Sequence, residues 1–304
     1  MSFWGRSRRR LQHLLAALAG GVLLCAGAAQ AQDTQTLRKI AATGTISLGH
    51  RESSVPFSYY DSRHQVVGYS HELMLRALDA VKAELKLPAL TLKLVPITSQ
   101  NRIPLVQNGT VDLECGSSTN NADRAKQVAF STSIFVVGTR LMVRRDSPVR
   151  DFNDLRNRRV VVTAGTTSER LLRLYNERQR LDIDIVPAKE HSGSFRVLEE
   201  GRADAFMLDD ALLYGERAKA LHPEDWVVVG EPMSSEVYGC MMRRGDTAFK
   251  AVIDRGLTRL MQSGEALKIY QRWFQKPIPP SGLNLNWPPS DALLALYRSP
   301  SDTP

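Results

Sequence analysis

Two segments of this chain share one pattern, in which an apolar, helix-like stretch ends at a glycine and an aspartate follows three positions later. Residues 109–112 (G-T-V-D) form the first copy and residues 201–204 (G-R-A-D) form the second. The agreement extends upstream, where residues 91–96 and 182–187 both alternate in polarity and both end in Val-Pro. Strands that alternate with helices in a repeated order predict two similar α/β lobes, each a mostly parallel sheet flanked by helices.

The order of the predicted elements indicates that the chain leaves the first unit, builds the second and then returns. Extended apolar segments at 130–145 and 237–243 are long enough to cross between lobes, and their glycines, Gly138 and Gly239, are candidate hinge points. The predicted boundaries are a first lobe over residues 32–137, a second lobe over residues 138–236, and a return to the first lobe with a C-terminal tail over residues 237–304.

Two local predictions concern the first unit. Met74, Ala77 and Val81 fall on one helical face, and Ser70 before them is the expected N-cap. Residues 111–115 are mostly apolar and follow a glycine stop, so we expect a short buried strand there.

Residues 1–31 have the pattern of a secretory signal. Four arginines near the start precede an apolar run at 11–26, and Ala29-Gln30-Ala31 supplies a small-x-small cleavage site. The apolar run is too short and too rich in alanine for a membrane span. We therefore expect cleavage near Ala31 and export to the periplasm, by either the Sec or the twin-arginine route.

Charge and cysteine content limit the function classes. Of the formal net charge of +8, four units come from the arginines of the signal, which leaves +4 without any basic tract and argues against nucleic acid as a partner. The six histidines lack metal-ligand spacing, and no nucleotide loop is present, so no cofactor is expected. The two cysteines that remain after cleavage, Cys115 and Cys240, are either a disulfide or two buried thiols.

Polar side chains follow the predicted strands, where open α/β sheets bind their ligands. Several arginines at one site suggest a ligand with more than one carboxylate, and an aspartate on the opposite lobe suits an ammonium group. These features fit an amino acid with an acidic side chain. The candidates are Arg51, Ser99, Arg102, Ser117, Thr119 and Arg124 in the first lobe, and Thr167 in the turn at 165–168, His191, Asp209 and Asp210 in the second.

Several short motifs along the chain resemble those of the glutamate/aspartate-binding proteins of bacterial amino-acid ABC transporters, in solute-binding protein family 3. They are G-H-R-E-S-S-V-P-F-S-Y-Y, P-I-T-S-Q-N-R-I-P-L, E-C-G-S-S-T-N-N, G-T-T-S-E, F-M-L-D-D-A-L-L and Y-G-C-M. The resemblance implies a type II periplasmic binding protein fold with two hinge strands. It also implies that the protein catalyses no reaction, closes on its ligand and delivers it to a membrane permease. We expect the protein to be a monomer.

The resemblance also implies a role for each candidate. Arg124 matches the arginine that holds the α-carboxylate, and Asp209 matches the aspartate that holds the α-ammonium group. Ser117, Thr119 and Thr167 match positions that complete this part of the site. The residues that match the surroundings of the side-chain carboxylate are Arg51, Ser99, Arg102 and His191.

Two rival functions remain open from the sequence. Cyclohexadienyl dehydratases share this architecture, and Glu52, Glu114 or Glu190 could serve as the general acid such an enzyme needs. A ligand-sensing module would have the same site as a transport protein. The preference between glutamate and aspartate is also open, because one methylene discriminates by only about 1 to 3 kcal/mol.

Overall fold

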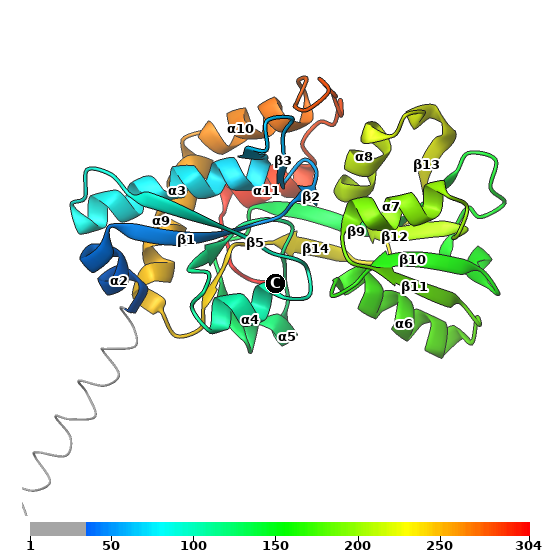
Figure 1. The fold of residues 1–304 in the computed structure, drawn as a ribbon, viewed down its shortest axis with the longest axis horizontal. Coiled ribbons are helices and arrows are strands. Elements are labelled where there is room, and N and C mark those ends of the chain that lie inside the picture. The colour runs from blue at the N-terminus through cyan, green and yellow to red at the C-terminus, as the bar shows by residue number, and fades with distance from the viewer. Residues whose placement is uncertain (1–34) are drawn as a thin grey trace, which may run out of the picture.

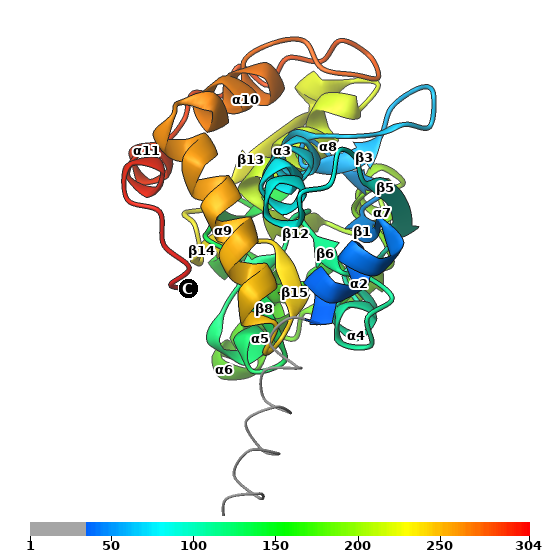
Figure 2. The same ribbon diagram turned by 90° about the vertical axis from the view of Figure 1, so that its left-hand side faces the viewer.

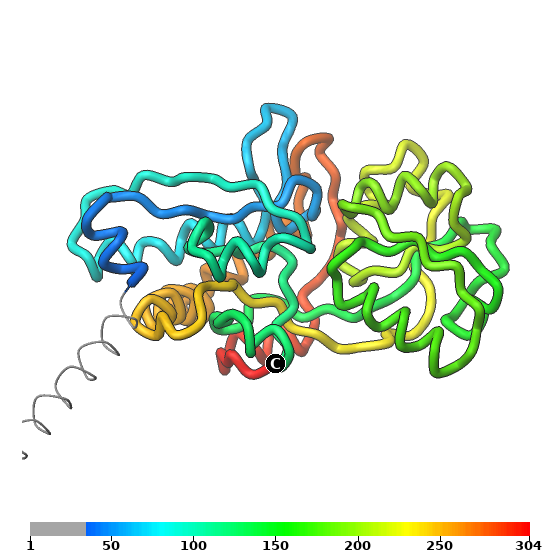
Figure 3. The backbone as a smooth tube through the Cα atoms, turned by 60° about the horizontal axis from the view of Figure 1, so that its bottom comes forward, coloured from blue at the N-terminus to red at the C-terminus, as the bar shows by residue number. Residues whose placement is uncertain are grey.

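The structure is a computed structural model that describes residues 35–304, so the predicted signal at 1–31 lies outside the described residues. Figure 1 shows two lobes side by side, with two strands crossing between them. The same division is visible in the backbone trace, where the chain passes between the lobes near the middle of the molecule (Figure 3).

The first lobe is built on a five-stranded sheet with the strand order β5-β1-β6-β15-β8. Strands β1, β5 and β6 are parallel, whereas β15 pairs antiparallel with β6 and β8. Helices α3 and α9 lie against each other along this lobe (Figure 2). The elements are α2 (Gln35–Thr43), β1 (Thr45–His50), α3 (Tyr69–Leu85), β5 (Thr91–Pro96), α4 (Arg102–Gln107), β6 (Leu113–Glu114), α5 (Ala122–Ala125), β8 (Val128–Phe130), β15 (Met241–Arg243), α9 (Thr247–Gln262), α10 (Glu265–Phe274) and α11 (Asp291–Arg298), with a small sheet of β2 (Ser53–Ser54), β3 (Ser58–Tyr60) and β4 (Val66–Val67).

The second lobe repeats the parallel arrangement. Strand β10 pairs in parallel with β11 and β12, and β9 continues this sheet in the antiparallel direction, with β13 also paired to it. Its elements are β10 (Arg159–Thr163), α6 (Thr167–Gln179), β11 (Asp184–Ala188), α7 (His191–Glu199), β12 (Ala205–Asp209), α8 (Asp210–Lys219) and β13 (Trp226–Val229).

Strands β9 (Phe135–Arg144) and β14 (Ser235–Tyr238) connect the lobes as an antiparallel pair. The beginning of β9 pairs with β14, whereas its later residues join the second-lobe sheet. Gly138 lies where the pairing changes, and the predicted lobe boundaries at 137/138 and 236/237 both fall within these two strands. The crossing therefore consists of hydrogen-bonded strands rather than loose linkers.

The repeated glycine and aspartate perform the same task in both lobes. Gly109 and Gly201 end their helices with φ of 78° and 67°, a left-handed conformation that glycine adopts without steric penalty. Asp112 exchanges two hydrogen bonds with Ser47, because its N–H donates to the Ser47 carbonyl and its carboxylate accepts from the Ser47 N–H, both at 2.8 Å. Asp204 makes the same pair with Arg159, at 2.7 and 2.8 Å. Each aspartate thereby aligns its strand with the first strand of its own lobe.

Two local predictions were wrong in detail. Ser70 does not cap α3: the helix begins at Tyr69 after Gly68, whose φ is 133° and whose lack of a side chain lets the Phe57 backbone approach closely. The strand expected at 111–115 is shorter in the structure. Strand β6 contains only Leu113 and Glu114, because only these two residues pair with β1.

The two cysteines form a disulfide, which decides between the alternatives that the sequence left open. Cys115 follows β6, and Cys240 lies between β14 and β15, with Cα atoms 4.3 Å apart and a sequence separation of 125. The bridge therefore closes a loop that contains the whole second lobe. In the chain-entropy account, a loop of this size contributes roughly 4 to 5 kcal/mol to stability.

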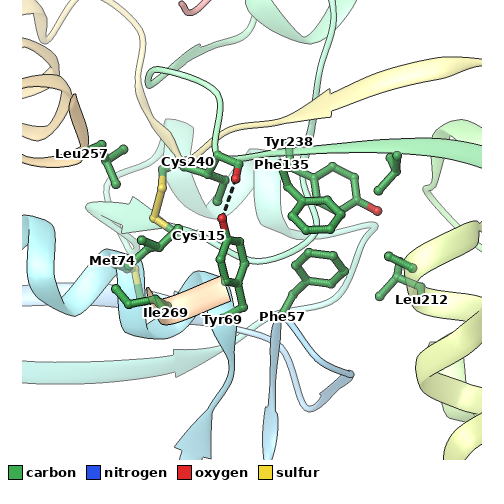
Figure 4. Packing of buried hydrophobic residues seen from close by; sticks show 14 of the residues in the cluster. Phe57, Tyr69, Met74, Cys115, Phe135, Leu212, Tyr238, Cys240, Leu257 and Ile269 are labelled. Atoms are coloured by element: carbon green, nitrogen blue, oxygen red, sulfur yellow. Dashed lines mark hydrogen bonds between the residues drawn. A yellow bond between two sulfur atoms is a disulfide. The ribbon is translucent and has the colours of Figure 1, made fainter. Parts of the chain in front are cut away.

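An aromatic cluster packs beside the disulfide where the crossing strands leave the first lobe (Figure 4). The ring of Phe57 lies 4.9 Å from that of Phe135 and 5.2 Å from that of Tyr238. The Tyr69 hydroxyl donates to the Ile134 carbonyl at 2.7 Å, which fixes the start of the crossing. Leu212 of α8 belongs to the same hydrophobic cluster, so the core is continuous between the lobes.

Helix α8 of the second lobe contacts the first lobe closely at Gly215. A Cβ atom added there would lie 2.2 Å from the Val55 carbonyl oxygen, whereas a Cβ added at Gly193 in α7 would meet nothing within 4 Å. Both glycines are inside helices. An alanine at either position favours the helix itself by about 1 kcal/mol.

We therefore expect Gly215→Ala to push the lobes apart and Gly193→Ala to leave them in place. Small-angle X-ray scattering of both variants measures this difference as a larger radius of gyration for Gly215→Ala. Equal radii for the two variants would contradict the close interlobe contact.

Candidate ligand-binding site

Nine of the ten candidate residues lie at or just beyond strand ends, on the sides of the two lobes that face each other. This placement follows from the parallel sheets, whose carboxyl ends meet at one edge. Arg51 follows β1, Ser99 and Arg102 follow β5, Ser117 follows β6, Thr119 lies in β7 (Thr119–Asn120), Arg124 lies in α5, Thr167 and His191 begin α6 and α7, and Asp209 ends β12. The tenth, Asp210, begins α8, and its Oδ1 accepts from the N–H of Gly138 at 3.3 Å.

Arg51, Ser99, Arg102 and His191 form the first part of the site. All four are buried, and Arg51 has no exposed surface. Arg102 is held in place because its Nη1 donates to the Ser117 carbonyl at 2.9 Å and to Ser118 Oγ at 2.6 Å. His191 is held through its Nδ1, which lies 2.9 Å from Thr163 Oγ1.

Each of these four side chains also has a buried polar atom without a hydrogen-bond partner within the described part of the chain. The atoms are Arg51 Nε and Nη1, Ser99 Oγ, Arg102 Nε and His191 Nε2. Leaving a buried polar group unpaired is costly, and such groups are rare in folded proteins. Five such atoms on these four residues therefore indicate a position that can receive an anion.

Burial shifts the ionisation of this cluster. It lowers the pKa of His191 well below its usual value, and the charges of Arg51 and Arg102 act in the same direction, so the imidazole is neutral at pH 7. Burial, and then repulsion from Arg124, lowers the pKa of Arg102 to about 9. The guanidinium group of Arg102 therefore remains charged at neutral pH.

The second part of the site brings the lobes together. Thr119 Oγ1 of the first lobe and Thr167 Oγ1 of the second lobe are 3.5 Å apart. Arg124 donates from Nη1 to the Thr119 carbonyl at 3.0 Å and from Nη2 to the Gly165 carbonyl across the cleft at 3.3 Å. Ser117 Oγ lies nearby in the first lobe, 3.5 Å from Ser54 Oγ. A pocket of about 460 Å³ opens beside Arg124 and Thr167.

Asp209 is buried among hydroxyl groups. Its Oδ1 accepts from Ser168 at 3.1 Å and from Thr139 at 3.4 Å, and its Oδ2 accepts from the Tyr238 hydroxyl. Burial raises the pKa of Asp209 to about 7, and repulsion from Glu236 contributes to the shift. An arriving ammonium group would favour the ionised form of this carboxyl.

Sequence reasoning assigned no role to Glu236 or Tyr238, although both contact candidate residues. Glu236 Oε2 accepts from Thr119 Oγ1 at 2.7 Å and from Thr167 Oγ1 at 2.8 Å. Both residues belong to β14, which begins two residues before the crossing segment predicted at 237–243, so that prediction included Tyr238 but not Glu236. The signal that could have found them is strand periodicity, since residues 236 and 238 share one face of a strand that passes the cleft.

The three glutamates considered as a general acid lie in three different environments. Glu52 is exposed, and Glu190 is paired with Arg51 at 2.8 Å. Glu114 is buried beneath Ser118, whose hydroxyl donates to it at 2.6 Å, and burial raises its pKa. Residues 35–304 contain no cluster of potential metal ligands, and none of their helices combines the length and the apolar character needed to cross a membrane.

Residues 46–276 match the model of the bacterial extracellular solute-binding proteins, family 3. The chain belongs to this family. It is 55% identical over 290 residues to the L-glutamate/L-aspartate-binding protein of Pseudomonas aeruginosa, covering 95% of this chain and 96% of that one. It is equally similar over 284 residues to a glutamate/aspartate import solute-binding protein of Escherichia coli, covering 92% and 94%. These relatives confirm the expected family and a binding protein rather than an enzyme.

Solved structures confirm the predicted type II fold. An arginine-binding protein from T. maritima, solved as its P235GK mutant, superposes with a TM-score of 0.70 at 28% sequence identity. The match covers 78% of this chain and 98% of the arginine-binding protein. An ancestral amino acid-binding protein described as a precursor of cyclohexadienyl dehydratase gives 0.67 at 27% identity, over 79% and 100%. The fold alone therefore does not separate binding proteins from that enzyme, whereas the two close relatives do.

The raised pKa of Asp209 predicts how its replacement changes stability with pH. The folded protein holds this proton more tightly than the unfolded chain, whose aspartate pKa is about 3.9. The contribution of Asp209 to stability is therefore largest below pH 4 and is lost as the pH rises toward 7 and above. Asparagine resembles the protonated form, so Asp209→Asn should raise the melting temperature more at pH 8 than at pH 5.

Thermal unfolding at the two pH values measures this effect. Glu177→Gln removes an exposed carboxylate from α6 of the same lobe and serves as the control. A change in melting temperature for Asp209→Asn that is the same at both pH values would contradict the raised pKa.

Proposed function

We propose that this protein is the periplasmic solute-binding component of an amino-acid ABC transporter, that it binds L-glutamate and L-aspartate between its lobes, and that it delivers them to a membrane permease. The observation that carries the proposal is the set of unpaired buried atoms on Arg51, Ser99, Arg102 and His191. They lie on the four residues that the sequence motifs associate with a side-chain carboxylate. The names of the close relatives support the same ligands.

The roles of the site residues follow from charge. Arg51 and Arg102 provide donors for the side-chain carboxylate, and the neutral His191 can add a contact through Nε2 without adding charge. Ser99 contributes a hydroxyl group with a free Oγ. Charge-assisted bonds of this kind are strong in a site from which closure removes water.

Backbone groups of the amino acid bind on the other side of the cleft in this proposal. Arg124 and the hydroxyl groups of Ser117, Thr119 and Thr167 receive the α-carboxylate and complete its surroundings, and Asp209 receives the ammonium group. Because Thr119 and Thr167 come from different lobes, a ligand that contacts both hydroxyl groups favours the closed arrangement. The protein acts as a monomer and is exported with its signal removed near Ala31.

Titration calorimetry tests this function directly. The mature protein from Gln32 onward, refolded to remove carried-over ligand, is titrated with L-glutamate, L-aspartate, L-glutamine and prephenate. Tight binding of the two acids with little heat from the others is expected, because only the acids satisfy both groups of donors. Binding of prephenate without binding of the acids would favour the dehydratase function instead.

The assignment of the side-chain carboxylate is tested by Arg51→Ala and Arg102→Ala. Each variant should weaken binding of glutamate and aspartate by at least tenfold, since a charge-assisted bond is worth about 1.5 to 3 kcal/mol. Their effect on glutamine should be much smaller, because its amide makes no ion pair. An equal loss for acids and amide would show that these arginines hold another part of the ligand or only maintain the fold.

A further inference from the structure

Two carboxylates of the protein contact the groups assigned to the two carboxylates of the ligand. Glu190 pairs with Arg51, and Glu236 accepts from Thr119 and Thr167. Neither glutamate has a ligand-binding role in the function proposed above. The first contact joins the two lobes directly, and the second joins the crossing strand to both lobes.

Glu190 reaches across the cleft from the second lobe. It stands immediately before α7, makes no side-chain hydrogen bond to the helix end, and extends toward the first lobe instead. Its Oε2 accepts from Arg51 Nη2 at 2.8 Å and lies 3.4 Å from Ser53 Oγ. The Glu190 side chain is only 16% exposed and that of Arg51 is fully buried, so water weakens this ion pair little.

Glu236 bridges both lobes from the crossing strand β14. A single oxygen, Oε2, accepts from the first-lobe hydroxyl of Thr119 at 2.7 Å and from the second-lobe hydroxyl of Thr167 at 2.8 Å. A ligand carboxylate that used both hydroxyl groups would have to take this place. Glu236 is also a source of the repulsion that raises the pKa of Asp209, the residue assigned to the ammonium group.

We propose that Glu190 and Glu236 form an internal carboxylate latch: each holds the contact of one ligand carboxylate while the cleft has no ligand, and the ligand binds by displacing both. This inference rests on the proposed function, since it names the residues with which the ligand competes. The exchange keeps the buried arginine paired with an anion throughout, which avoids the penalty of an isolated buried charge. A ligand with two carboxylates can replace both Glu190 and Glu236 in these contacts.

Binding measurements on Glu190→Gln and Glu236→Gln test the competition. Glu190→Gln should tighten binding of glutamate and aspartate by roughly tenfold, with a smaller change for glutamine, whose amide gains no ion pair with Arg51. Glu236→Gln should tighten binding of all three amino acids by a similar factor, because they share the α-carboxylate. Glu177→Gln in α6, which removes an exposed charge from the second lobe, is the matched control.

Small-angle X-ray scattering of the ligand-free protein tests the latch without any ligand. The double variant Glu190→Gln/Glu236→Gln should have a larger radius of gyration than the wild type and the control, because both bridging carboxylates are lost. Saturating glutamate should return the double variant to the radius of the liganded wild type, which shows that it is folded and can close.

The outcomes separate this inference from the function on which it rests. If the wild type binds the acids but both variants bind them more weakly than the control does, the glutamates assist the ligand and the latch is wrong. If the wild type binds neither acid, the proposed function fails, and the scattering comparison still decides whether the two glutamates hold the lobes together. An unchanged radius for the double variant would overturn the latch in either case.

Discussion

Burial of three guanidinium groups between two lobes is the constraint on which the rest of this structure depends. A buried charge is tolerated only when it is paired and hydrogen-bonded, and breaking such pairing is costly. Arg102 and Arg124 are anchored by carbonyl and hydroxyl oxygens, and Arg51 is anchored by Glu190. The pairing is incomplete, since donors of Arg51 and Arg102 remain unpaired within residues 35–304. In the proposed function, these unpaired donors are the groups that bind the ligand carboxylate.

The strands, the crossing and the disulfide together bring these charged side chains to one place. The reciprocal hydrogen bonds of Asp112 and Asp204 align the strands of each lobe, so that the carboxyl ends lie at one edge. The pairing of β9 with β14 then turns the two edges toward each other, and the disulfide fixes the first lobe where β14 returns to it. Because the site has residues from both lobes, its cross-cleft distances depend on how the lobes are oriented about this crossing.

On the acidic side of the site, two carboxyl groups of the protein repel each other. Burial raises the pKa of Asp209 to about 7, and repulsion from Glu236 adds to the shift. Hydroxyl groups of Tyr238 and Ser168 stabilise the aspartate but do not remove the strain between the two acids. In the proposed function, the ammonium group of the ligand offsets this repulsion. The site therefore contains a positively charged part and a negatively charged part, and the protein itself neutralises each of them only in part.

The sequence by itself determined the α/β class, the two-unit organisation and the nine candidate residues, because these depend on local periodicity and on which residues follow each strand. The family motifs then suggested a role for each residue, and the structure brings them together at the facing strand ends. The start of α3 and the length of β6 escaped prediction because they depend on contacts with Phe57 and β1 rather than on local propensity.

Only the tertiary structure decided the pairings across the cleft. Glu190 and Arg51 are 139 positions apart, Glu236 and Thr119 are 117 apart, and the two half-cystines are 125 apart. No local pattern encodes such distances. These contacts across the cleft depend on how the two lobes are oriented about β9 and β14. In a different orientation, Glu190 and Glu236 would face solvent instead of the site.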